Sequence, residues 1–139
     1  MASRLIFAPL AAAWLLAASS QLPAAEPDLN PAILLGEQTF ADNCRKCHQL
    51  DGYGEEALYP SLHQQRLLSD KTLLIQTLLH GRMGQGPSPT AEPERLMPAL
   101  DFLSNREIAA LIAYISSSWG DEVIVVSEED VQAARQTNP

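Results

Sequence analysis

Basic side chains are scarce in this chain of 139 residues, which has 9 lysines and arginines against 17 aspartates and glutamates and a formal net charge of −8. Nucleic-acid binding depends on basic patches, so this balance argues against that class of function. Long apolar runs are lacking as well. The apolar run over residues 5–18 is interrupted by Pro9 and is too short to span a membrane comfortably, so we expect no stable membrane span in the mature chain.

Cysteine is equally scarce, because Cys44 and Cys47 are the only two in the chain. A Cys-x-x-Cys pair can be half of a zinc site or a redox disulfide. A zinc site would need two more ligands, and His63 and His80 are not spaced like a zinc pair. A thioredoxin-like disulfide would need a βαβ pattern nearby, whereas the surroundings read as helical. Both alternatives are therefore disfavoured.

Residues 44–48 read Cys-Arg-Lys-Cys-His, which is the attachment signature of a c-type haem. Each thiol adds to one haem vinyl group, and the histidine that follows is placed as the proximal iron ligand. The motif occurs once, and the chain has no internal repeats. We therefore predict one haem c, attached covalently through Cys44 and Cys47, with His48 as an axial ligand of the iron.

The first 25 residues have the pattern of a secretory signal peptide. Residues 1–4 carry a positive charge, residues 5–18 are apolar, and small residues follow. We expect cleavage after Ala25, within a window from about residue 20 to 25, and an uncleaved anchor is the alternative. The predicted location is a bacterial periplasm, which suits a haem that is attached outside the cytoplasm.

The mature residues 26–139 suit one small domain, and their pattern predicts an all-α fold. A first helix is expected to begin with Asn30 as N-cap and Pro31 as its first residue, and to run towards the haem motif. A second helix is expected between a Ser69 cap and Gly81. Residues 81–98 contain three glycines and four prolines, so no regular structure is expected there.

Two more helices are predicted after that loop. Ser104 and Glu107 form a capping box for a helix that ends near Trp119, with apolar residues on one face. Ser127 is expected to cap a last short helix that runs through Arg135.

The iron needs a ligand opposite His48 unless it is built to bind small molecules. His63, His80, Met83 and Met97 are the candidates. We favour Met97, because it lies on a loop long enough to reach the second haem face and apolar residues follow it. A thioether ligand favours ferrous iron and raises the reduction potential. There are alternatives for each of the four. Met97 could instead fill a gap in the core, and Met83 could be the ligand. His80 could be an exposed histidine stabilised by the helix dipole, and His63 a surface residue.

The mature chain resembles class I cytochromes c of the bacterial mono-haem kind over residues 32–119. The family pattern is matched by Gly36 and Phe40, the haem motif, Tyr59-Pro60-Ser61-Leu62, Met97-Pro98-Ala99, and a final helix over 108–119 with Tyr114. The resemblance implies a small cytochrome c fold, with three to five helices wrapped around one haem, and leaves residues 120–139 as a C-terminal extension. It also implies that Gly36 lets the first and last helices cross closely, with Tyr114 at the crossing.

The resemblance also implies roles for residues around the haem. Pro60 would accept a hydrogen bond from the second ring nitrogen of His48 through its backbone carbonyl, and Leu62 belongs to the same cofactor-binding segment. Arg82 would pair with a haem propionate, with a solvated arginine as the alternative. The chain departs from the family in having Tyr59-Pro60-Ser61 where a Pro-Pro pair is common.

These observations predict a periplasmic one-electron carrier rather than an enzyme, passing electrons between a dehydrogenase or respiratory donor and a terminal acceptor. Residues 103–135 are similar to cytochrome subunits and domains that accept electrons from periplasmic dehydrogenases, including quinoprotein alcohol dehydrogenases. A haem enzyme or small-ligand sensor with a vacatable sixth iron position is the alternative.

Assembly and docking are open at this point. The extension over residues 120–139 is either a docking element of a fixed subunit or a tail packed on its own domain. Arg45 and Lys46 form either a basic docking spot within an acidic surface or two solvated charges.

Overall fold

The computed structural model describes residues 29–55, 59–63, 65–82 and 97–137 of the chain. The predicted signal peptide over residues 1–25 lies outside these residues, as does Met83. The described part is helical and contains no strand, which confirms the all-α prediction. Its elements are α1 (Leu29–Asn43), α2 (Arg45–His48), a short 3-10 helix η1 (Arg66–Ser69), α3 (Lys71–His80), α4 (Asn105–Trp119) and α5 (Glu128–Gln136).

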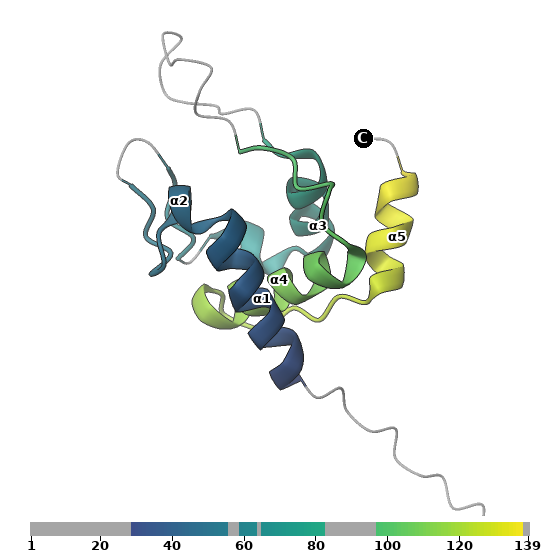
Figure 1. Ribbon diagram of the computed structural model, residues 1–139, viewed down its shortest axis with the longest axis horizontal. Helices are drawn as coiled ribbons and strands as arrows, with labels where there is room; N and C mark the ends of the chain where they lie inside the picture. The colour runs from purple at the N-terminus through teal and green to yellow at the C-terminus, as the bar shows by residue number, and fades with distance from the viewer. Residues whose placement is uncertain (1–28, 56–58, 64, 83–96, 138–139) are drawn as a thin grey trace, which may run out of the picture.

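Helix α1 lies across α4, and α2 and α5 lie at opposite ends of the molecule (Figure 1). Gly36 makes the crossing possible, because a β-carbon built there would lie 2.6 Å from the Tyr114 Cβ and closer still to the Ala110 carbonyl oxygen. The Phe40 ring packs beside it, with centroids 5.6 Å from Tyr114 and 5.0 Å from Trp119. The structure therefore confirms the expected close approach at Gly36.

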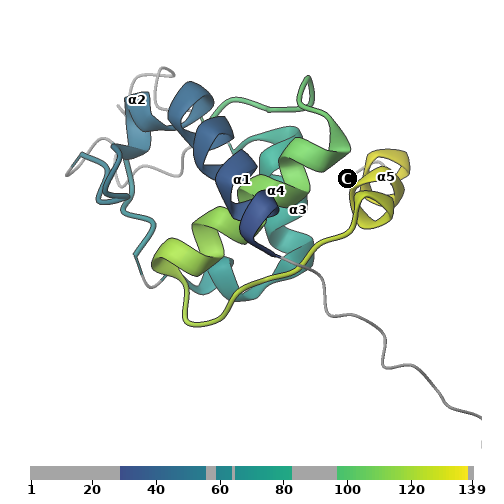
Figure 2. The same cartoon turned by 60° about the horizontal axis from the view of Figure 1, so that its bottom comes forward.

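Helices α3 and α4, which lie beside each other in Figure 2, supply more of the buried side chains than the other elements do. Helix α4 is amphipathic at helical spacing, so its apolar face is buried, and of its polar residues only Ser116 is buried with that face. The largest fully buried side chains are Phe40, Leu74, Leu79, Ile108, Leu111, Ile112, Ser116 and Val131. None of the described helices is long and apolar enough to cross a membrane.

Local capping explains where α4 begins and where α3 ends. The Glu107 N–H donates to Ser104 Oγ at 3.2 Å, and the Ser104 N–H donates to Glu107 Oε2 at 2.8 Å, which confirms the predicted capping box. Gly81 ends α3 with φ +71°, and its N–H donates to the Thr77 carbonyl at 2.9 Å.

Two predicted helix starts were wrong by one or two residues. Asp70, not Ser69, caps α3, because its carboxylate accepts the Leu73 N–H at 2.9 Å while Ser69 ends η1. Asn30 lies inside α1 instead of capping it, since the helix already includes Leu29. The following Pro31 is tolerated because it still lies in the first turn, where N–H groups have no partner within the helix.

The extension over residues 120–139 packs on its own domain as far as it is described. The Ser116 hydroxyl accepts the Ile124 N–H at 2.9 Å, which turns the chain back along the core. Val131 is completely buried, and Ser127 caps α5 in a second capping box with Asp130. These contacts favour the packed tail over a free docking element.

Candidate haem site

The end of α1 and the single turn of α2 gather the haem motif. The Cys44 N–H donates to the Phe40 carbonyl at 2.8 Å, so Cys44 extends the hydrogen-bonding pattern of α1. The Cys44 carbonyl in turn accepts the N–H groups of Cys47 and His48 at 3.1 and 2.9 Å. The backbone that carries both thiols and the imidazole is therefore held in place by these hydrogen bonds.

Both sulfur atoms are free thiols, and they differ in burial. Cys44 is 9% exposed and belongs to the hydrophobic core, whereas Cys47 is half-buried. Burial, with a smaller contribution from Cys47, raises the pKa of Cys44 to about 12. Cys44 is therefore a neutral thiol at physiological pH in this packed arrangement.

His48 is oriented by the loop that follows it. Its Nδ1–H donates to the Pro60 carbonyl at 3.2 Å, so Nε2 is left with its lone pair. Burial lowers the pKa of His48, and the hydrogen bond to Pro60 partly opposes that shift. The imidazole is thus held in the neutral form and in the tautomer that a metal ligand requires.

Backbone hydrogen bonds hold Pro60 in position. Tyr59 and Glu55 exchange two of them, at 2.8 and 3.2 Å, and the Gly54 N–H donates to the His48 carbonyl at 3.0 Å. Gly54 has φ +69°, and a β-carbon there would lie 2.9 Å from the Pro60 oxygen. The loop therefore needs glycine at this position to bring the Pro60 carbonyl to the imidazole.

His63 is more engaged than the sequence suggested. It was expected on the surface, but it is half-buried, its Nε2–H donates to the Asp51 carbonyl at 2.8 Å, and its ring stacks on Tyr53 with centroids 3.9 Å apart. Its contacts join the loop after the haem motif to Trp119, whose ring centroid lies 6.1 Å away. Sequence reasoning missed this aromatic cluster because its members lie far apart in the chain.

Met97 and Arg82 meet through their backbones. The Arg82 N–H donates to the Met97 carbonyl at 3.0 Å and the Met97 N–H returns a bond to the Arg82 carbonyl at 3.1 Å. Met97 is half-buried and packs against the same hydrophobic cluster as Leu62 and Cys44, whereas Arg82 is exposed. His80 is also exposed, at the C-terminal end of α3.

These groups fit a c-type haem. The two thiols are free, the histidine beside them presents Nε2 with Nδ1 already bonded, and a thioether packs on the cluster to which Cys44 belongs. The structure thus brings Cys44, Cys47, His48 and Pro60 together directly, and Arg82 and Met97 together as a second group.

Comparison with known proteins agrees with this site. The family model for cytochrome c matches residues 33–119, which is more than half of the chain. The chain belongs to the cytochrome c family. Membership implies covalently bound haem c, and proteins of this family are electron-transfer proteins rather than enzymes.

Two kinds of relative are similar to this cytochrome. The cytochrome c subunit of a quinone alcohol dehydrogenase from Gluconacetobacter polyoxogenes is 30% identical over 112 residues, which cover 78% of this chain and 24% of that protein. Cytochrome c-552 of Thermus thermophilus is 32% identical over 91 residues, which cover 62% of this chain and 69% of that protein. The chain thus spans about a quarter of the length of the dehydrogenase subunits it matches.

Proposed function

We propose that the protein is a periplasmic one-electron carrier with a single haem c, attached through Cys44 and Cys47 and ligated by His48 and Met97. The observation that carries this proposal is the 3.2 Å hydrogen bond from His48 Nδ1 to the Pro60 carbonyl, next to two free thiols. It leaves Nε2 as the ring nitrogen available to iron. When bound, the haem iron supplies reversible one-electron oxidation and reduction.

Each residue of the proposed haem site has a separate role. Cys44 and Cys47 hold the macrocycle, and the carbonyl of Pro60 keeps the His48 ring in one orientation. Met97 supplies a thioether that raises the reduction potential. Leu62, packed on the hydrophobic cluster, and Arg82, beside Met97 in the backbone, complete the proposed cofactor-binding set as an apolar contact and a propionate partner.

The proposed electron donor is a quinone-dependent dehydrogenase or another redox protein of the periplasm. Support comes from the dehydrogenase cytochrome c subunits of two further species, of which that from Gluconobacter oxydans is 28% identical over 106 residues. The charged, apolar and small-residue pattern of residues 1–25 supports export to the periplasm.

The ligation is tested by absorbance spectra of the haem-loaded ferric and ferrous protein. A thioether ligand gives a low-spin spectrum with a weak far-red band that arises from the iron–sulfur bond. We expect this band in the wild type, its loss in Met97→Ala, and its retention in Met83→Ala, which removes the other methionine of the same loop.

Three results would contradict the proposal. The band could persist in Met97→Ala, it could disappear in Met83→Ala, or the wild type could be high-spin and bind carbon monoxide rapidly. The last result would favour a haem enzyme or a small-ligand sensor with a vacatable sixth iron position.

A further inference from the structure

Helix α5 holds the turn that follows Met97. The guanidinium of Arg135 donates Nη1–H to the Asp101 carbonyl at 2.7 Å, Nη2–H to the Leu103 carbonyl, and Nε–H to Asn105 Oδ1 at 2.8 Å. One side chain near the end of the chain therefore binds three points between Met97 and the first turn of α4.

Arginine suits this task better than any other side chain. Its planar guanidinium presents several N–H groups in a rigid fork, so it can satisfy two neighbouring carbonyl groups at once. A lysine in its place would carry the same charge on a flexible stem and could not reproduce the forked geometry. Arg135 is also half-buried, which reduces the competition from water for these bonds.

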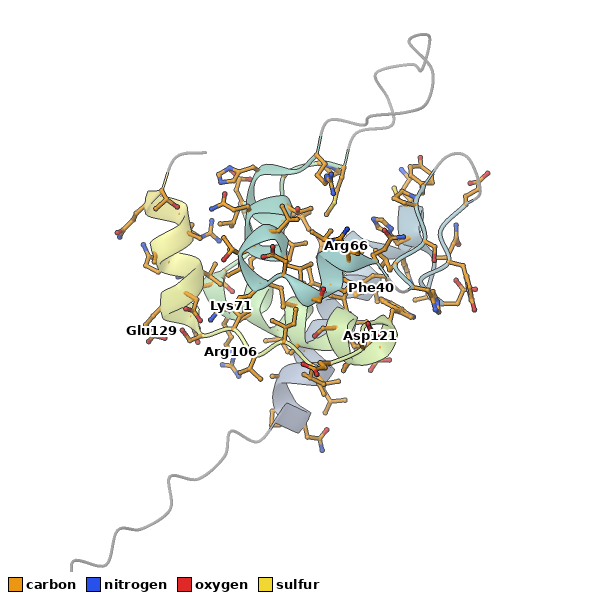
Figure 3. All side chains as sticks on the ribbon, turned by 180° about the vertical axis from the view of Figure 1, so that it is seen from behind. Phe40, Arg66, Lys71, Arg106, Asp121 and Glu129 are labelled. Carbon is orange, nitrogen blue, oxygen red and sulfur yellow. The ribbon has the colours of Figure 1, made fainter. Side chains whose placement is uncertain are left out.

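Helix α5, which carries Arg135, is itself held against the rest of the protein by several contacts. Val131 is completely buried, and Gln132 Oε1 accepts a hydrogen bond from Asn105 Nδ2 at 3.0 Å. Asp130 forms a 2.6 Å ion pair with Lys71 at the start of α3, and Figure 3 shows Lys71 lying between α3 and α5. The helix is thus tied to both α3 and α4.

The segment between Met97 and α4 is held on both sides. Before it, the backbone of Met97 pairs with Arg82. Within it, the Leu100 N–H donates to the Leu78 carbonyl at 2.8 Å, and the Leu103 N–H closes a turn onto the Leu100 carbonyl at 3.1 Å. Arg135 binds two carbonyl groups of this turn, those of Asp101 and Leu103.

We propose that Arg135 is a positioning residue for Met97. By holding the turn over residues 100–103, it keeps the thioether in place and slows its detachment from iron. This inference rests on the proposed ligation by Met97. It assigns the C-terminal extension a part in tuning the haem site, although α5 lies at the opposite end of the molecule from α2 (Figure 1).

The experiment measures how fast cyanide binds to the ferric, haem-loaded protein. At saturating cyanide this rate is limited by detachment of the thioether, so it reports local opening of the Met97 segment. We expect Arg135→Gln to raise the limiting rate about tenfold, which corresponds to the loss of roughly one charge-assisted hydrogen bond. Arg135→Lys should give a smaller increase, and Arg106→Gln, at an exposed arginine on α4, should give none.

Gly36→Ala is the matched control for general loss of stability. Its β-carbon would overlap the Ala110 carbonyl at the crossing of α1 and α4, so it weakens the fold without touching the turn or α5. Thermal unfolding of every variant is recorded beside the cyanide rates. Fast cyanide binding in Arg135→Gln, with a near wild-type rate in Gly36→Ala, supports a positioning role.

The results that overturn the inference differ from those that overturn the proposed function. A wild type without the far-red iron–sulfur band removes Met97 as ligand, and the inference fails with it. A wild type with the band, and an Arg135→Gln rate equal to that of the wild type or of Gly36→Ala, removes the inference alone. If Arg135→Gln does not fold, the Arg135→Lys comparison decides the matter by the same criterion.

Discussion

Gly36 shows how a single missing side chain sets the distance between two helices. Glycine inside a helix costs about 1 kcal/mol relative to alanine, and α1 accepts this cost in its middle. In return the backbone of α4 can approach until the Ala110 carbonyl occupies the space of the absent β-carbon. Phe40 then reaches Tyr114 and Trp119.

Gly36→Ala is therefore expected to destabilise the protein despite its better helix propensity. A β-carbon would overlap the Ala110 carbonyl and lie 2.6 Å from the Tyr114 Cβ, so the helices must separate. Overpacking of this kind costs about 1–3 kcal/mol. Urea unfolding followed by circular dichroism measures the change, and the neighbouring exposed Glu37→Ala should stay within about 0.5 kcal/mol of wild type. A Gly36→Ala protein as stable as wild type would show that the crossing is not tight in solution.

At this scale the sequence predicted what depends on near neighbours. The Ser104–Glu107 capping box spans only four residues, so its pattern is visible in the sequence and the structure confirms it. The three bonds of Arg135 join residues 30 to 34 positions apart and have no local pattern. The bond between His48 and Pro60 was expected only from the family resemblance.

Charged contacts help to hold helix α5 in place. Asp130 accepts the Ser127 N–H in its capping box and pairs with Lys71. Together these interactions lower the pKa of Asp130 from 3.8 to about 2, with Lys71 as the larger cause. The Ser127 cap predicted this helix, but nothing in the sequence indicated that it packs on α3 and α4.

Acid should loosen α5 in a defined pH range. The folded pKa of Asp130 lies below its ordinary value, so its contribution to stability is present above about pH 4 and is lost as the pH falls towards 2. We expect the hydrogen-exchange protection of the Val131 amide to fall over this range. Asp130→Asn should show low protection already at neutral pH and a weaker response to acid. An unchanged protection factor in the wild type between pH 4 and 2 would contradict this prediction.

At the scale of the whole molecule, the position of the few basic side chains determines where anionic partners are attracted to this acidic protein. The formal net charge is −8, and Arg45 and Lys46 are both exposed on the turn that carries the two cysteines. They lie at the α2 end of the molecule, away from Arg106 near α5 (Figure 3). A basic spot beside the haem attachment site would attract anionic partners to that end.

Small charged oxidants can test this surface without a protein partner. Ferricyanide is an anion, so Lys46→Glu should slow its oxidation of the ferrous protein several-fold at low ionic strength, and the difference should shrink as salt is added. Arg106→Glu carries the same change in net charge and should have a much smaller effect. Equal rates for the two variants would mean that only overall charge matters and that Arg45 and Lys46 are ordinary solvated residues.

The all-α architecture could be predicted from the sequence because caps and apolar periodicity mark helices locally. The sequence predicted Ser69 as the cap of α3, whereas the cap is Asp70. Both residue types are good caps, and the choice between them depends on where η1 ends. The packing of the extension could not be predicted, although its helix was. That packing depends on the buried Ser116 hydroxyl, which accepts the N–H of Ile124, eight residues later in the chain.

The crossing of α1 and α4 also bears on when Cys44 is accessible. In a chain that has not yet folded, residues 105–119 do not cover the thiols of Cys44 and Cys47. Once α4 has packed, Cys44 is only 9% exposed within the closed core. We therefore expect attachment at Cys44 to precede the packing of α4, while the chain is still unfolded.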